Sequence, residues 1–286
     1  MRRPSCPSRR AQAVEAVTLA HGVRGPGPPF VLLAGTGYAG ATWGDALVKR
    51  LAERFTVVTL DYRGTGKTPG TDDDYSTRLF AADAAGLIDE LGLGPAHVLG
   101  HSMGGRVAQW VAIDAPDRVR SLVLAACGSG EYRADHAPQF GIPLANAIAL
   151  IEKGYERTIA DQIRRTFFTP EFIASSPATV DALIGAFWEN RPSLRDYLKH
   201  VIARQGHDTV DRLAEIDQPC LVIVGDRGTH LGGTGSHLDQ SRYLAGHLPR
   251  AELRVAEGVA HGLFWQNPDP VIAEVVGFLE REPARG

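Results

Sequence analysis

The stretch Gly100-His101-Ser102-Met103-Gly104-Gly105 decides the fold class of this chain. It follows a short apolar run around Val98, which favours a strand, and it leads into residues 106–113, whose pattern favours a helix. A serine flanked by small residues at such a junction sits on a sharp, strained turn that raises its hydroxyl above the carboxyl edge of the sheet. The turn also leaves the Met103 amide at the helix N-terminus, where it can donate to a developing oxyanion. We therefore predict that Ser102 is a nucleophile and that the Met103 amide belongs to its oxyanion hole.

Short apolar runs recur on both sides of this motif and alternate with helical patterns. Runs of this kind suit strands that are buried on both faces, as in a parallel sheet covered by helices. Strands are expected at Phe30–Leu33, Phe55–Leu60, His97–Leu99, Ser121–Ala126, Cys220–Val224 and Glu252–Val255. Ser76 is placed to cap a helix that ends at Gly92. The sequence thus predicts an α/β fold with a mostly parallel sheet flanked by helices.

Residues 128–214 interrupt the alternation, because they show helical patterns and no convincing strand. We expect them to form a helical lid inserted between two strands of a core made of residues 13–127 and 215–286, with residues 1–12 as a disordered tail. Aromatic side chains of this lid either line a pocket above Ser102 or hold the lid's own helices together. They are Phe167, Phe168, Phe172, Phe187, Trp188 and Tyr197.

The amino-acid composition limits the classes of binding partner that we expect. The formal net charge is −3, with 30 basic and 33 acidic residues, so no global charge favours nucleic acid or an anionic membrane. The three cysteines, Cys6, Cys127 and Cys220, have no C-x-x-C spacing, and neither a metal nor a cofactor is indicated. No apolar run approaches the length that spans a bilayer. We expect a cytoplasmic monomer or homodimer that acts on a small hydrophobic substrate and binds neither nucleic acid nor membrane.

The motif around Ser102 resembles the nucleophile elbow of the α/β-hydrolase superfamily, in the lidded group whose elbow reads G-H-S-M-G-G. The resemblance extends from about Phe30 to Leu279. It implies an eight-stranded, mostly parallel sheet, a helical lid after the sixth strand, and a triad in the chain order serine, acid, histidine. His261 lies just after an expected strand and before the last helix, which is similar to the family's histidine loop. Imidazole suits a general base at neutral pH, so His261 is the predicted base of Ser102.

The loop after Phe30–Leu33 reads Ala34-Gly35-Thr36-Gly37-Tyr38, where most relatives carry His-Gly. Its glycines let the backbone turn its amides toward the nucleophile. We expect the Thr36 amide, with Gly37 in reserve, to complete the oxyanion hole beside Met103.

The acid departs most from the family's pattern. Relatives carry G-D/E-x-D after the strand that matches Cys220–Val224, and the last acid of that motif orients the histidine. This chain has Gly225-Asp226-Arg227-Gly228, so the expected position is a glycine. Asp226 is the first candidate, because in an extended segment its side chain faces the same way as position 228. Glu131, at a place to which some relatives move the acid, and Asp239 are alternatives, and a Ser102–His261 dyad without an acid is the fourth.

These residues predict a cofactor-independent serine hydrolase that forms an acyl-enzyme at Ser102 with an ester, lactone or related carbonyl of a hydrophobic small molecule. The altered acid motif and the missing oxyanion-loop histidine leave a second interpretation open. In it the chain is a non-hydrolytic lyase or cyclase of secondary metabolism, in which Ser102 and His261 position or deprotonate the substrate. A ligand-binding receptor on the same fold is the third interpretation.

Overall fold

Seven strands form one sheet in the computed structural model, which describes residues 14–130, 144–228 and 236–282. The strand order is β1-β3-β2-β4-β5-β6-β7, with β1 antiparallel to β3 and every other pair parallel. The strands are β1 His21–Arg24, β2 Pro29–Leu33, β3 Thr56–Leu60, β4 Ala96–His101, β5 Val119–Ala125, β6 Cys220–Gly225 and β7 Ala251–Ala256. The predicted α/β class and mostly parallel sheet are confirmed, and the six strands expected from apolar runs are all present.

The strand count implied by the resemblance is wrong, since seven strands rather than eight form the sheet of the described residues. The edge strand β1 was not predicted, because all of its residues are exposed and it has no apolar run. An edge strand of a mixed sheet is held by its backbone hydrogen bonds and needs no buried side chain.

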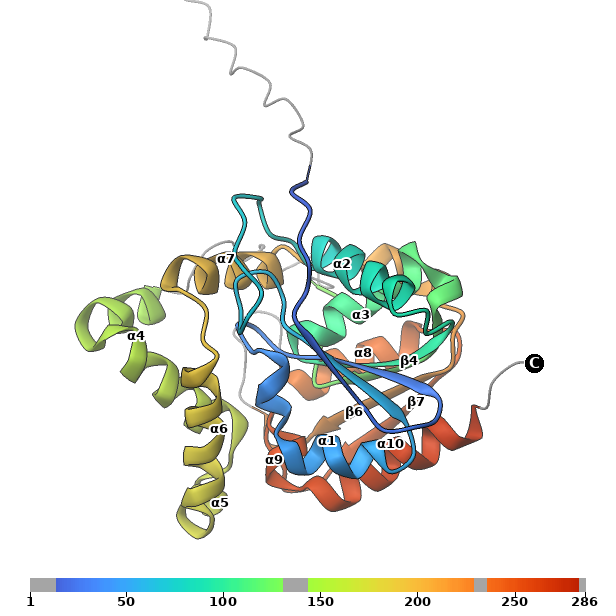
Figure 1. Ribbon diagram of the computed structural model, residues 1–286. Coiled ribbons are helices and arrows are strands. Elements are labelled where there is room, and N and C mark those ends of the chain that lie inside the picture. Colours follow the sequence, from blue (N-terminus) through green and yellow to red (C-terminus); the bar gives the residue numbers. More distant parts are fainter. Residues whose placement is uncertain (1–13, 131–143, 229–235, 283–286) are drawn as a thin grey trace, which may run out of the picture.

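Helices cover both faces of the sheet (Figure 1). Alternate residues of β2 point to opposite faces: Phe30 and Leu32 pack with α1 and α10, and Val31 and Leu33 pack with α2, α3 and α8. The helices are α1 Asp45–Ala52, α2 Thr77–Glu90, α3 Met103–Asp114, α8 His237–His247, α9 Leu263–Gln266 and α10 Pro268–Arg281, with short 3₁₀ turns at η1 Gly40–Trp43 and η2 Pro116–Arg118. The expected cap of α2 is present, because the Ser76 hydroxyl accepts a hydrogen bond of 3.0 Å from the Leu79 amide.

Helices also fill the described part of the segment between β5 and β6. They are α4 Leu144–Phe167, α5 Pro170–Ser175, α6 Pro177–Glu189, α7 Leu194–Gln205 and the 3₁₀ turn η3 Val210–Glu215. Helix α4 is kinked at Gly154, whose φ is 80°. Figure 1 shows α4, α5 and α6 grouped at one side of the sheet. This is the segment in which a helical insertion was expected.

Within the described ranges, no helix combines the length and apolarity that crossing a membrane requires.

Candidate active site

Ser102 stands between the end of β4 at His101 and the start of α3 at Met103. Its φ is 57° and its ψ is −117°, a conformation that costs a non-glycine residue about 1–3 kcal/mol and persists only where surrounding structure enforces it. Two backbone hydrogen bonds enforce it here: the Ser102 amide donates to the Ala125 carbonyl at 2.9 Å, and the Gly105 amide donates to the Ser102 carbonyl at 3.1 Å. The half-buried serine is therefore held on a strained turn at the carboxyl edge of the sheet.

The glycines of the motif are required by close backbone approach. A Cβ at Gly100 would lie 2.2 Å from the Gly104 carbonyl oxygen, and a Cβ at Gly104 would lie 2.0 Å from the Leu33 carbonyl oxygen. Both obstacles are backbone atoms that cannot rotate away. Helix α3 can therefore begin directly against the end of β2 only with glycine at position 104.

Two glycine-to-alanine variants test this. Gly104→Ala is expected to lower the free energy of unfolding by roughly 1–3 kcal/mol or more, because the methyl overlaps the backbone at Leu33. Gly86→Ala is the matched control, since Gly86 also lies inside a helix but has no atom within 4 Å of an added Cβ. It should stabilise by about 0.5–1 kcal/mol. Urea unfolding measures both, and equal effects of the two variants would contradict the steric argument.

The loop after β2 lies against Ser102. A Cβ at Gly35 would be 3.5 Å from the Ser102 Cβ, and the Gly35 carbonyl closes a turn by accepting from the Tyr38 amide at 3.1 Å. Gly37, with φ of 74°, supplies the left-handed conformation in this turn. Thr36 is buried, and its hydroxyl has no hydrogen-bond partner in the described part of the chain. The predicted oxyanion loop thus borders the predicted nucleophile, and the roles of the Thr36 and Met103 amides stay predictions.

His261 follows β7 and is buried, with 4% of its surface exposed. Its carbonyl oxygen lies 2.9 Å from Nε2 of His101, and the two imidazole rings are 4.6 Å apart between centroids. Because His101 directly precedes Ser102 in the chain, the His261 loop packs against the end of β4 that leads into the predicted nucleophile, and the role of His261 as its base stays a prediction.

The inserted helical segment fixes the histidine loop from the other side. The His261 amide donates to the Thr166 carbonyl at 3.2 Å, and the Gly262 amide donates to the Phe167 carbonyl at 2.9 Å. The Phe167 ring meets the His261 ring edge-on at 5.1 Å. The end of α4 therefore packs directly against the loop that carries His261.

Burial lowers the pKa of His261 well below its ordinary value, and the nearby His237, His101 and Arg204 lower this pKa further. The imidazole is therefore neutral at neutral pH. A neutral imidazole can accept a proton, as a general base must.

The structure does not bring Asp226 to His261. Its Oδ1 accepts a hydrogen bond of 2.7 Å from the Gly258 amide and lies 3.7 Å from Nε of Arg227, whereas Nδ1 of His261 has no hydrogen-bond partner within the described residues. The reason is local: residues 226 and 227 form a turn, with the Arg227 amide bonded to the Val259 carbonyl. The extended segment on which the Asp226 prediction rested is absent, so that prediction is corrected.

Asp239, one of the two alternative acids, has other partners in the structure. Asp239 closes the N-terminus of α8, where its carboxylate accepts from the amide and the hydroxyl of Ser236 at 2.9 and 2.8 Å. Glu131 lies outside the described residues.

His237 is a residue beside the predicted base that the sequence analysis did not single out. It is buried, and its ring stacks on His261 with 4.1 Å between centroids and 27° between planes. The capping box formed by Ser236 and Asp239 was the available signal, since it fixes the start of α8 and places His237 in the first turn.

Aromatic residues of the inserted segment contact both the oxyanion loop and one another, and their role in lining a pocket stays a prediction. Phe167 stacks on Tyr38 of the oxyanion loop at 5.4 Å, and Phe187 meets the same tyrosine at 5.1 Å. Phe168 and Phe172 stack on each other at 5.4 Å and hold α4 to α5. The side of the site that faces the inserted helices is therefore apolar and aromatic.

Among the described side chains, no group of three or more histidine, cysteine, aspartate or glutamate residues is arranged to hold a metal ion.

The buried histidines predict a pH dependence of stability. Burial lowers the pKa of His101 and of His200 to about 4 and that of His237 to about 3, so each binds its proton more weakly in the folded chain than in the unfolded chain. The free energy of unfolding is therefore highest above about pH 6.5, where these histidines are neutral in both states. It falls as the pH drops toward 4, by up to about 1.4 kcal/mol per pH unit for each such histidine. Urea unfolding between pH 7.5 and 4.5 measures this, and a midpoint that does not move would contradict it.

Comparison with known proteins identifies the fold family. The model of the family described as the alpha/beta hydrolase fold matches residues 28–268. Over 260 residues the chain is 27% identical to 2-hydroxy-6-oxononadienedioate/2-hydroxy-6-oxononatrienedioate hydrolase 1 of Dechloromonas aromatica. The aligned region covers 87% of this chain and 86% of that hydrolase.

Solved structures share the fold at lower identity. The enol-lactonase of Burkholderia xenovorans superposes with a TM-score of 0.78 at 24% identity, covering 92% of this chain and 97% of that one. A thermophilic esterase of Thermogutta terrifontis gives a TM-score of 0.77 at 23% identity, covering 94% and 95%.

Proposed function

The chain belongs to the α/β-hydrolase fold family and is an enzyme of that family, and we propose that it is a serine hydrolase with Ser102 as nucleophile and His261 as general base. The observation that carries the proposal is the placement of Ser102. It sits on a strained turn beside the Gly35 loop, and the residue before it, His101, contacts the buried imidazole of His261. Strain of this kind is kept where a side chain must be presented in one position.

The proposed reaction uses side chains, backbone amides and water. Oγ of Ser102 attacks the substrate carbonyl while its proton passes to His261, and the carbonyl oxygen becomes an oxyanion that the amides of Thr36 and Met103 stabilise. The imidazolium returns the proton to the departing oxygen as the bond to the carbonyl carbon breaks. A water molecule, deprotonated by His261, then attacks the acyl-enzyme and releases the acid and free Ser102.

The aromatic wall favours a hydrophobic acyl or leaving group. Phe167 contacts Tyr38 and His261, so an apolar group bound there would lie beside the reacting carbonyl. Two of the matched structures are described as an enol-lactonase and an esterase, which supports an ester or lactone as substrate.

A non-hydrolytic lyase or cyclase is the second candidate, and the state of His261 favours it. Its Nδ1 has no partner among the described residues, so no acid there orients the ring for repeated proton transfer. In a lyase or cyclase, the histidine would remove one proton from carbon in each turnover. In the hydrolase it must act in both acylation and deacylation, which places a stricter demand on the orientation of its ring.

Turnover of a p-nitrophenyl ester series and of aliphatic lactones separates the two candidates. The serine hydrolase predicts release of p-nitrophenol, with a rapid burst where deacylation is the slower step, and loss of both in His261→Ala. Folded protein that hydrolyses neither ester nor lactone would sink the hydrolase proposal and leave the lyase or cyclase.

A further inference from the structure

The position at which relatives carry the acid is Gly228 in this chain, which has no side chain. The backbone of Gly228 faces His237, because a Cβ at Gly228 would be 3.4 Å from Nδ1 of that histidine. The His237 ring in turn stacks on His261. The missing carboxylate would therefore have pointed at the two stacked imidazoles.

Both imidazoles have an unused polar atom in this buried place. His237 is 6% exposed and His261 is 4% exposed, and Nδ1 of each lacks a hydrogen-bond partner among the described residues. Buried polar atoms are nearly always paired, and an unpaired one in a native protein calls for a ligand or another explanation. An imidazole Nδ1 that carries hydrogen is a donor, so the complementary ligand is an acceptor.

Arg204 adds a positive charge to the same place. It shares one face of α7 with the buried Tyr197 and Val201, at helical spacing, and Tyr197 borders the oxyanion loop at Gly37. Its guanidinium has no hydrogen bond or ion pair with any described residue, and its charge contributes to lowering the pKa of both His237 and His261. An unpaired cation in a partly buried setting favours an anion.

The two described carboxylates that were candidates for the acid have other partners. Asp226 is bound to the Gly258 amide, and Asp239 is bound to Ser236. Among the described groups, the stacked imidazoles and the Arg204 charge therefore have no carboxylate bonded to them.

We propose that the space beside Gly228, His237 and His261 binds a carboxylate, which takes the position of the missing acid and orients His261. The proposal rests on the proposed function. The carboxylate accepts from Nδ1–H of His261 and stays ionised, while Nε2 takes the Ser102 proton, so the imidazolium forms beside a negative charge. The carboxylate belongs either to the substrate itself or to a small free acid, and both share the same chemistry.

Binding is tested first without reference to activity. Sodium formate is titrated into the full-length protein at constant ionic strength, with sodium chloride as the balancing salt, while the imidazole resonances of His237 and His261 are followed by NMR. Saturable shifts of both rings are expected, and Arg204→Gln should weaken formate binding about tenfold or more. Absence of shifts, or equal shifts with chloride, overturns the anion site whether or not Ser102 proves to be a nucleophile.

The consequence for the reaction is tested with three variants at position 228. Gly228→Asp supplies the carboxylate within the chain, so it should react about tenfold or more faster with a fluorophosphonate and no longer respond to formate. Gly228→Ala adds the Cβ without the charge, so it measures the effect of the methyl alone and should not be accelerated as Gly228→Asp is. Gly228→Asn adds the same bulk without ionising and should not be accelerated. Equal rates in the Asp and Asn variants would contradict the proposal.

Two esters distinguish the sources of the carboxylate. A neutral p-nitrophenyl ester is compared with the p-nitrophenyl monoester of a dicarboxylic acid. Faster turnover of the acidic ester without formate, with formate as a competitor, identifies the substrate's own carboxylate. Activation of the neutral ester by formate identifies a free acid. If formate shifts neither the imidazoles nor either rate, the proposal is overturned, and the fluorophosphonate reaction of Ser102 still reports on the proposed function separately.

Discussion

Replacing Ser102 by alanine is expected to lower kcat for ester hydrolysis by roughly 10⁴- to 10⁶-fold, with little change in the free energy of unfolding. The loss is large because no other described side chain at this turn can form the acyl-enzyme, and what remains is the rate supported by substrate binding and the oxyanion hole alone. Steady-state kinetics with a p-nitrophenyl ester measures kcat, and urea unfolding measures stability.

Ser129→Ala is the control for this prediction. Ser129 is also buried near the end of a strand, and its hydroxyl has no hydrogen-bond partner in the described part of the chain. Its removal should leave both kcat and stability nearly unchanged. If Ser102→Ala kept most of the activity, Ser102 would not be the nucleophile.

Replacing Arg63 by methionine is expected to lower the free energy of unfolding by about 3–5 kcal/mol. Arg63 is 2% exposed, and its guanidinium binds both oxygens of Asp83, at 2.6 and 2.7 Å, and one oxygen of Asp73, at 2.9 Å. It also donates to the Glu15 carbonyl at 2.7 Å. Methionine fills most of the volume but leaves two poorly exposed carboxylates without their cation.

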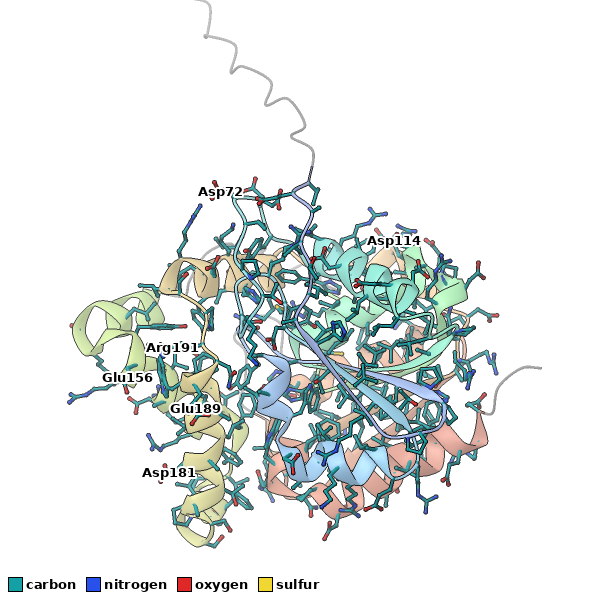
Figure 2. The ribbon with its side chains drawn as sticks, viewed as in Figure 1. Asp72, Asp114, Glu156, Asp181, Glu189 and Arg191 are labelled. Atoms are coloured by element: carbon teal, nitrogen blue, oxygen red, sulfur yellow. The ribbon has the colours of Figure 1, made fainter. Side chains whose placement is uncertain are left out.

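Arg118→Met removes an ion pair of similar geometry from an exposed position. The Arg118 Nε lies 2.9 Å from Asp89, and both side chains are largely solvated. Its urea midpoint should match that of the natural protein, because solvent screens such pairs. Other exposed pairs are of the same kind, and Figure 2 shows their partners Asp72, Asp114 and Asp181 at the outside of the molecule. Equal losses for Arg63→Met and Arg118→Met would contradict the role given to burial.

The core was predictable because burial on both faces leaves a direct trace in the sequence. Runs such as Cys220–Val224 are continuously apolar, since helices cover both sides of β6. The edge strand His21–Arg24 left no such trace, because exposed backbone pairing places no demand on its side chains. The eighth strand was an expectation from the family, and nothing in the apolar pattern of this chain had predicted it.

Within the site, residues fixed by local geometry were predictable and those fixed by long-range packing were not. The turn at Ser102 follows from neighbours in the sequence, because the glycines at positions 100 and 104 permit the close approach it requires. The acid depends on how the chain leaves β6, and a turn at residues 226–227 directs Asp226 to Gly258 instead of His261. The capping box places His237 in the first turn of α8, but the contact of His237 with His261 joins different elements and depends on long-range packing.

Reaction of the purified protein with a fluorophosphonate, followed by mass spectrometry of the intact chain and its peptides, tests the central claim most directly. The account predicts one covalent adduct per chain, located on Ser102, absent in Ser102→Ala and slowed in His261→Ala. A folded protein that forms no adduct, or carries it on a residue other than Ser102, would contradict the account.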